Sequence, residues 1–168
     1  DLRNERVRTV EVTIPGDRPT LRDQDVNFAQ FAENFAVSPS GLQAVVEARG
    51  DLWPLPAEEG KGPEVNITAT SGVAEREPAW SPDGRWVAYL SDESGEYEVH
   101  VIEANPGEDR VRDTKQLTSN GEHWRYIEGW TPDSEHIIYS DKTGAVYLLN
   151  VETGEDRMAF RDTWGNRV

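Results

Sequence analysis

Apolar and polar residues alternate in short runs along most of the chain, which is the period of β-strands. EYEVHVIE (96–103) alternates clearly, and RWVAYL (85–90) and AVYLLNVE (145–152) are short β-rich runs of similar length. Polar segments rich in Gly, Pro, Asp and Ser separate these runs and are typical of turns. Long stretches with a helical period do not occur, so the pattern predicts an all-β protein.

The strands and turns recur as a repeat. Three turns align, Ser38-Pro39-Ser40-Gly41, Ser81-Pro82-Asp83-Gly84 and Thr131-Pro132-Asp133-Ser134, and each follows a short apolar run. After each turn come a β-rich run, a second polar turn and a further strand. Four short antiparallel strands in a unit of roughly 40 to 50 residues are typical of a β-propeller blade.

The sequence therefore predicts a β-propeller fragment of about three four-stranded antiparallel blades. Residues 1–34 are expected to hold an N-terminal strand (Val7 to Ile14) and a linker, and residues 35–168 the blades, approximately 35–70, 71–120 and 121–168. The fourth strands are expected at VNIT (65–68), KQLT (115–118) and RMAF (157–160). RWVAYL is apolar on both faces and predicts a strand sandwiched between blades, whereas EYEVHVIE alternates and predicts a strand nearer the rim.

Three blades leave two terminal faces without a neighbour. Exposed faces of this kind form large apolar patches, which soluble monomers avoid. We therefore expect self-association, with a dimer that forms a six-bladed ring as the first hypothesis. If the chain is part of a longer protein, the missing blades would instead come from the same polypeptide.

The composition narrows the classes of partner. The formal net charge of -15, from 32 acidic and 17 basic residues, repels phosphate, so nucleic acid and anionic membranes are not expected partners. Because cysteine is absent, disulfides, thiolate catalysis and cysteine-based zinc sites are excluded. We expect no cofactor. The compartment stays open, with the cytoplasm slightly favoured over the periplasm or secretion.

Several residue types common in active sites have simpler explanations. Ser81 and Asp83 crowd together in one turn, but the turn recurs in each repeat, and its Pro, Asp and Gly suit turn positions. His100, His123 and His136 are scattered, which does not suit a catalytic triad or a zinc site. The sequence therefore predicts neither catalytic residues nor a metal site.

Two loops between blades are candidates for a binding site, because such loops gather near the mouth of a propeller channel. They are SGVAEREP (71–78) and SNGEHWRYIEG (119–129), and their charged and aromatic residues suit peptide recognition. The candidates are Glu75, Arg76, Glu77, His123, Trp124, Arg125 and Tyr126. The alternative is structural: Arg76 and Arg125 pair with neighbouring carboxylates, and Trp124 packs between blades.

At these residues the sequence resembles the propeller portion of the tricorn protease family. The matching text is FAVSPSGLQAVVEARGDLWPLPAEEG, NITATSGVAEREPAWSPDGRWVAYLSDESGEYEVHV and KQLTSNGEHWRYIEGWTPDSEHIIYSDKTGAVYLLNVETGE. The repeated Ser-Pro-Asp-Gly turn is also similar to that of TolB-type propellers.

The resemblance implies propellers of six or seven blades that gate or guide peptides toward a separate serine protease domain, which is not recognisable in this chain. It thus implies a non-catalytic module that binds peptide or protein. The alternatives are a purely structural scaffold and, least favoured, a hydrolase.

Overall fold

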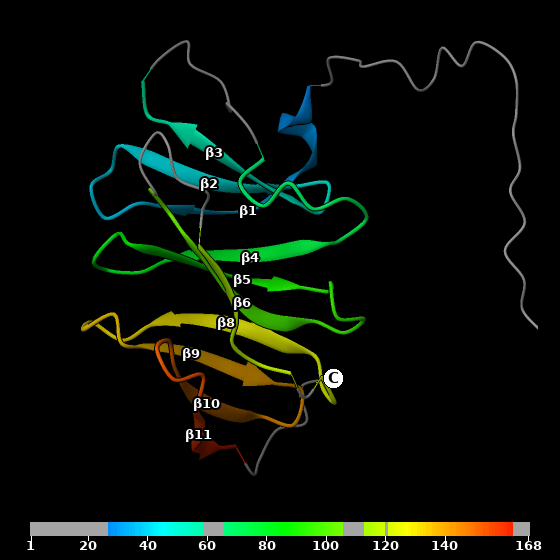
Figure 1. The fold of residues 1–168 in the computed structure, drawn as a ribbon, viewed down its shortest axis with the longest axis vertical. Helices are drawn as coiled ribbons and strands as arrows, with labels where there is room; N and C mark the ends of the chain where they lie inside the picture. The colour runs from blue at the N-terminus through cyan, green and yellow to red at the C-terminus, as the bar shows by residue number, and fades with distance from the viewer. Residues whose placement is uncertain (1–26, 59–65, 106–112, 120, 163–168) are drawn as a thin grey trace, which may run out of the picture.

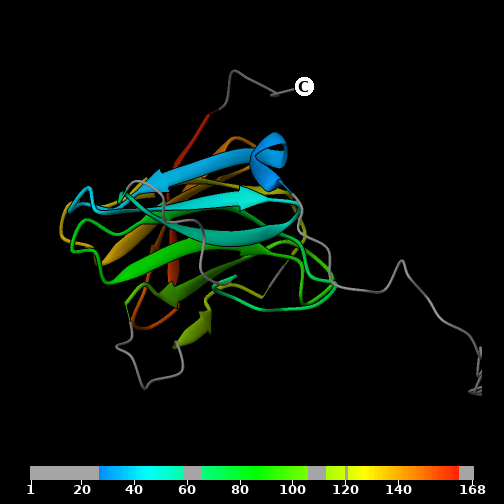
Figure 2. The ribbon, with the colours of Figure 1, turned by 90° about the horizontal axis from the view of Figure 1, so that it is seen from above.

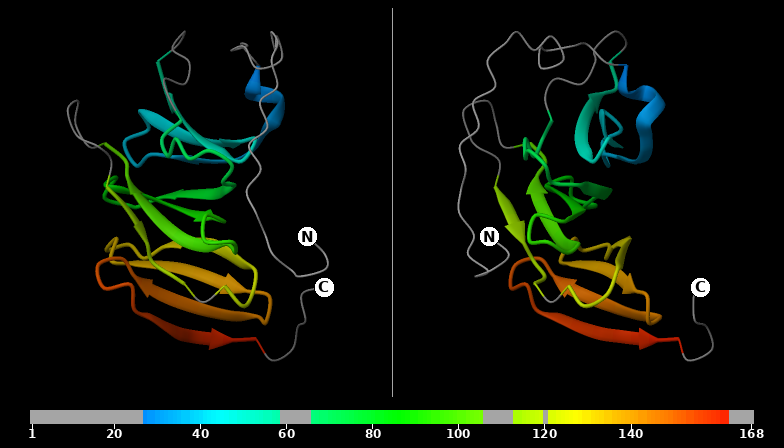
Figure 3. Two further views of the ribbon diagram at one scale, coloured as in Figure 1. Left: turned by 45° about the vertical axis from the view of Figure 1, so that its right-hand side comes forward. Right: turned by 90° about the vertical axis from the view of Figure 1, so that its right-hand side faces the viewer.

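Three antiparallel sheets, one for each repeat, stack face to face in chain order (Figure 1). The computed structural model describes residues 27–58, 66–105, 113–119 and 121–162. Both views of Figure 3 show the same succession of sheets, and in Figure 2, which looks from above, the sheets overlap one behind the next. The predicted all-β propeller architecture is confirmed. The expected strand Val7 to Ile14 lies outside the described residues.

Each sheet is a meander in which neighbours in sequence are neighbours in space. The first sheet contains β1 (Ala32–Val37), β2 (Gln43–Ala48) and β3 (Asp51–Pro56), and the short 3-10 helix η2 (Phe28–Phe31) precedes it. The second contains β4 (Glu75–Trp80), β5 (Trp86–Ser91), β6 (Glu98–Glu103) and β7 (Thr114–Gln116). The third contains β8 (Arg125–Trp130), β9 (His136–Asp141), β10 (Ala145–Asn150) and β11 (Asp156–Arg161). The first blade thus begins with β1, ahead of the expected start at residue 35.

The repeated turn joins the first two strands of each sheet, as predicted. In the second sheet Ser81 Oγ donates to Asp83 Oδ1 at 2.5 Å and accepts from the backbone N–H of Trp86 at 2.9 Å. Gly84 has a φ of 73°, a conformation that glycine adopts without strain. Asp83 is therefore occupied in holding the turn, and the hydroxyl of Ser81 caps the start of β5.

The middle sheet is buried on both faces. One core lies between the first two sheets, with Val45 and Leu52 against Val87, Tyr89 and Ile102. The other lies between the second and third sheets and contains Trp86, Ala88, Leu90, Val99, Val101, Ile137, Tyr139, Leu149 and Val151. Every residue of β5 is buried, so the prediction of a sandwiched strand is confirmed.

EYEVHVIE forms β6, the third of the four strands, and therefore lies nearer the rim than RWVAYL, as predicted, but both of its faces are buried. In β6 Glu98 and His100 are as buried as Val99 and Val101, because neighbouring sheets cover both faces of this strand. Alternation of polar and apolar residues indicated a wet face, but the polar residues there lie in the sheet-to-sheet contacts.

The first sheet has three strands within the described residues, not four. The expected strand at VNIT is reduced to one backbone hydrogen bond, in which Ile67 N–H donates to the carbonyl of Leu52 at 3.0 Å. Residues two apart in a strand point their backbone groups to the same edge, so Pro54 and Pro56 lie on the same edge as Leu52. Since proline has no N–H, this edge lacks the donors that a full fourth strand needs.

The described residues contain no helix long and apolar enough to cross a membrane.

Candidate functional site

The first strands of the three sheets line a shared groove. β4 contacts both β1 and β8, and the groove between them has a volume of about 380 Å³. Each of these strands carries a register shift, or β-bulge. Bulges redirect side chains and are common beside binding sites. The lining residues are Asn34, Phe35, Glu77, Pro78, Ala79, Tyr126, Ile127 and Glu128.

Glu77 lies at the centre of the groove and joins all three sheets. Its φ of 53° is a left-handed conformation that non-glycine residues adopt rarely. Its N–H donates to Glu47 Oε2 of the first sheet at 3.0 Å, and its Oε2 accepts from Ile127 N–H of the third at 2.9 Å. Burial raises the pKa of the Glu77 carboxyl, which the hydrogen bond from Ile127 only partly offsets.

Two of the seven predicted site residues, Glu77 and Tyr126, lie together in this groove. Glu75 is buried instead and accepts hydrogen bonds from the hydroxyls of Thr68 and Thr70, and burial raises its pKa. Arg76 is half exposed, with its guanidinium 5.9 Å from the ring centre of Tyr97.

Arg125 is buried and occupied. Its Nη1 donates to Glu98 Oε2 at 2.8 Å and to the carbonyl of Tyr97 at 2.9 Å, which ties the third sheet to the second. Glu98 also accepts from the Thr118 hydroxyl and from Gly121 N–H at 2.6 Å. This geometry supports the structural alternative for Arg125, in which it pairs with a neighbouring carboxylate.

His123 lies in a second, more polar pocket of about 260 Å³, which is lined by the third sheet and the loop that leads into it. Tyr139 and Tyr147 stack there with ring centres 4.9 Å apart, and Tyr139 donates its hydroxyl hydrogen bond to Asp156. Burial raises the pKa of both phenols. Nearby, Trp124 packs edge-on against Tyr97. The pocket is lined by Glu122, His123, Arg125, Tyr139, Asp141, Tyr147, Asp156 and Arg161.

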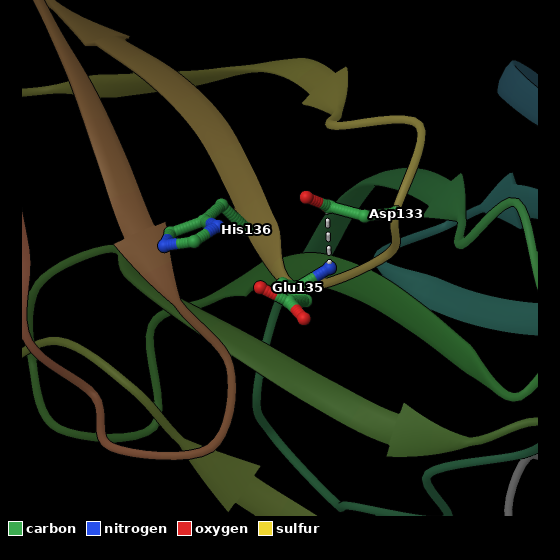
Figure 4. Close-up of side chains that lie close together, drawn as sticks. All are labelled: Asp133, Glu135 and His136. Atoms are coloured by element: carbon green, nitrogen blue, oxygen red, sulfur yellow. Dashed lines mark hydrogen bonds between the residues drawn. The ribbon is translucent and has the colours of Figure 1, made fainter.

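Three groups with metal-ligating atoms lie close together at the repeated turn of the third sheet: Asp133, Glu135 and His136 (Figure 4). Their nearest ligand atoms are all within 4.8 Å of one another. Asp133 Oδ1 accepts from the Thr131 hydroxyl at 2.5 Å and from Glu135 N–H at 3.0 Å, so it already organises the turn. The bond from Thr131 lowers the pKa of Asp133. The expectation of no bound metal stays a prediction.

Sequence reasoning missed Asn34, Phe35 and Glu128, because it looked for binding groups in loops and not on strands. Their common signal is a position four or five residues before a turn proline, which places them on the first strand of each blade.

His100 lies on the alternating strand β6 and is buried. Its ring lies 5.5 Å from that of Tyr89, and its buried Nε2 has no hydrogen-bond partner within the described residues. Burial lowers its pKa below the ordinary 6.5, although Glu93 and Glu98 oppose this shift. The folded protein therefore holds His100 as the neutral imidazole.

We expect acid to destabilise the protein through His100. The unfolded chain binds this proton more strongly than the folded one, so the contribution is complete above pH 6.5 and is lost as the pH falls below it. Urea unfolding should show a steeper loss of stability below pH 6.5 in the native sequence than in His100→Phe. Glu75 and Glu77, whose raised pKa values act in the opposite direction, are common to both proteins. Identical pH profiles would contradict the prediction.

Comparison with known proteins agrees with this architecture, although no protein-family model matches the chain. Tricorn protease homolog 1 of Streptomyces coelicolor is 32% identical over 104 residues, which is 61% of this chain and 9% of the relative. Tricorn protease homolog 2 of the same organism is 28% identical over 145 residues, 86% of this chain and 12% of the relative.

Among solved structures, TolB from Acinetobacter baumannii superposes with a TM-score of 0.61 at 18% identity, over 75% of this chain and 31% of TolB. This likeness concerns the fold alone. The chain spans only 9–12% of the curated relatives it matches. The chain is thus similar to a small portion of tricorn protease homologs, and its fold is that of a partial β-propeller, as its sequence resemblance implied.

Proposed function

We propose that this chain is a non-catalytic propeller module that binds peptide segments in the groove formed by β1, β4 and β8. The observation that supports the proposal is that the first strands of all three sheets line one groove of about 380 Å³. Relatives named as tricorn protease homologs support a role beside a peptidase, in which the propeller part guides peptides.

The chemistry of the groove favours cationic peptide segments. Glu77 and Glu128 provide carboxylates, and Tyr126 and Phe35 provide exposed aromatic surface. Carboxylates accept hydrogen bonds from Lys, Arg or a peptide amino terminus, and aromatic rings attract cations over their faces. The net charge of -15 also attracts cationic segments over longer distances.

The test is a fluorescence titration with short cationic, neutral and anionic peptides of one length. We expect the cationic peptides to bind, and Tyr126→Ala to weaken their binding about tenfold, which is 1.4 kcal/mol. Glu128→Gln should weaken it as well, whereas Glu155→Gln, at an exposed carboxylate outside the groove, should not. Equal binding by Tyr126→Ala would contradict this site.

Two other outcomes separate the alternative functions. Failure of every peptide to bind would favour a structural scaffold. Peptide cleavage by the purified chain, abolished by none of the groove variants, would instead point to a hydrolase.

A further inference from the structure

The two end sheets expose the same positions that the inner contacts bury. We call the side of a sheet toward the next sheet in chain order its forward face, and the opposite side its rear face. Within the described residues no further sheet covers the forward face of the third sheet or the rear face of the first, although η2 contacts β2 of the first sheet. Strand register makes the positions on these faces comparable between sheets.

The forward face shows this at the outer end of each sheet. Ile67 N–H donates to Leu52 O at 3.0 Å, and Leu117 N–H donates to Val99 O at 2.8 Å, so the two residues are equivalent. Both side chains pack against the core in front of their sheet. In the third sheet the equivalent residue is Phe160, which pairs with Val146 of β10 and is 63% exposed.

The rear face shows the same relation at the residue two positions before each turn proline. Trp80 packs against the core between the first and second sheets. Trp130 packs against the next core and donates its Nε1–H to the carbonyl of Ala79 at 3.0 Å. The equivalent residue of the first sheet is Val37, which is 55% exposed. Its register partner is Ala44.

A polar contact also recurs, although its carboxylates come from different strands, Glu47 from β2 and Glu77 from β4. At each inner contact a forward-facing carboxylate accepts the N–H of the residue five positions before the next turn proline: Glu47 accepts from Glu77, and Glu77 accepts from Ile127. The third sheet also has a forward-facing carboxylate, Glu128, which Ser140 Oγ holds at 2.6 Å. The residue at the donor position of the first sheet is Asn34.

We propose that the forward face of the third sheet binds the rear face of the first sheet of a second copy of this chain. Phe160 and Val37 then come to lie in a new core, and Asn34 N–H of one copy donates to Glu128 of the other. Because propellers typically have about 4 to 8 blades, two copies of three blades close a ring, whereas three copies would exceed that range. The groove lined by β1, β4 and β8 then becomes half of a closed channel.

The contact is head to tail, so each of its two faces has its own test. The native chain should elute and scatter light as a species of twice 18.9 kDa. Val37→Glu and Phe160→Glu should each give a species of 18.9 kDa, because each places a charge in the new core. Both side chains are exposed in the single chain, so the circular dichroism of the variants should stay nearly unchanged, and the unfolding midpoints of the two variants should agree with each other and not depend on protein concentration. Met158→Glu, at an exposed apolar residue on the face opposite Phe160, should leave the dimer intact.

Mixing the two variants gives the decisive result. One copy with an intact forward face and one with an intact rear face still share one native contact, so Val37→Glu and Phe160→Glu together should form a dimer that neither forms alone. A native species of 18.9 kDa would overturn the proposal and would favour the alternative in which blades of a longer polypeptide cover the two faces. A dimer insensitive to either variant, or no dimer on mixing, would overturn the head-to-tail contact. The readout is mass, so it is independent of peptide binding.

Discussion

Replacing Glu98 with glutamine is expected to lower the free energy of unfolding by about 3–5 kcal/mol. This is the largest loss of stability that we predict for the replacement of one charged residue. The side chains of Glu98 and Arg125 are 2% and 5% exposed, and their atoms approach to 2.8 Å. A neutral amide leaves the guanidinium buried without its counter-charge. Urea unfolding of the native chain and the variant measures the change.

The matched control is Glu96→Gln, two residues along the same segment and exposed, which should change stability by no more than about 0.5 kcal/mol. An effect of Glu98→Gln as small as that of the control would contradict the assigned role. The double variant Glu98→Leu with Arg125→Leu should recover much of the loss, because it removes both buried charges together.

This result also bears on function. Arg125 was a candidate for peptide binding, but a variant that loosens the contact between the second and third sheets deforms the groove as well. Loss of peptide binding in Arg125→Ala would therefore not identify a contact with the peptide. Tyr126 and Glu128 are better probes, since both line the groove and neither joins the buried ion pair. Because Glu128 also belongs to the proposed contact between copies, its variant is best compared in the monomeric Val37→Glu background.

Alanine at Leu149 is expected to cost about 2–5 kcal/mol, whereas alanine at its neighbour Leu148 should cost about 1 kcal/mol. Leu149 is fully buried in the core between the second and third sheets. Leu148 points to the opposite, forward face and is only half buried. The measurement is thermal or urea unfolding in the Phe160→Glu background, which keeps the chain monomeric.

In the native background the difference between the two losses of stability should be smaller, because dimer formation buries Leu148. The stability of the chain then also depends on protein concentration. Equal losses for the two alanine variants in the monomeric background would show that the third sheet is covered on both faces. That outcome would contradict the open forward face.

Much of the fold was accessible from local patterns. The repeated turns at Pro39, Pro82 and Pro132, each followed by a short apolar run, are local signals, because a turn depends on the backbone preferences of the residues within it. The burial of RWVAYL on both faces followed from its lack of alternation. The site was only partly accessible: Glu77 and Tyr126 were identified, but as members of loops.

The errors share one physical cause. Glu98 and His100 alternate with valines, and alternation normally indicates a solvated face; here His100 lies beside Tyr89, on the face that packs against the first sheet, and Arg125, far along the chain, pairs with the carboxylate of Glu98. Nor did the apolar character of VNIT predict that Pro54 and Pro56 would deprive the neighbouring edge of donors.

The sequence by itself thus determined the strands, the turns and the number of repeats, since these depend on contacts between residues close in the chain. Only the tertiary structure decided which polar residues are buried, which strands line the groove, and which two faces stay open. Those properties depend on how one sheet lies on the next, and no short stretch of residues carries that information. Val37 and Phe160 illustrate the division: each is an ordinary strand residue in sequence, and only the stack of sheets shows that its equivalents pack, partly buried, against the cores between sheets.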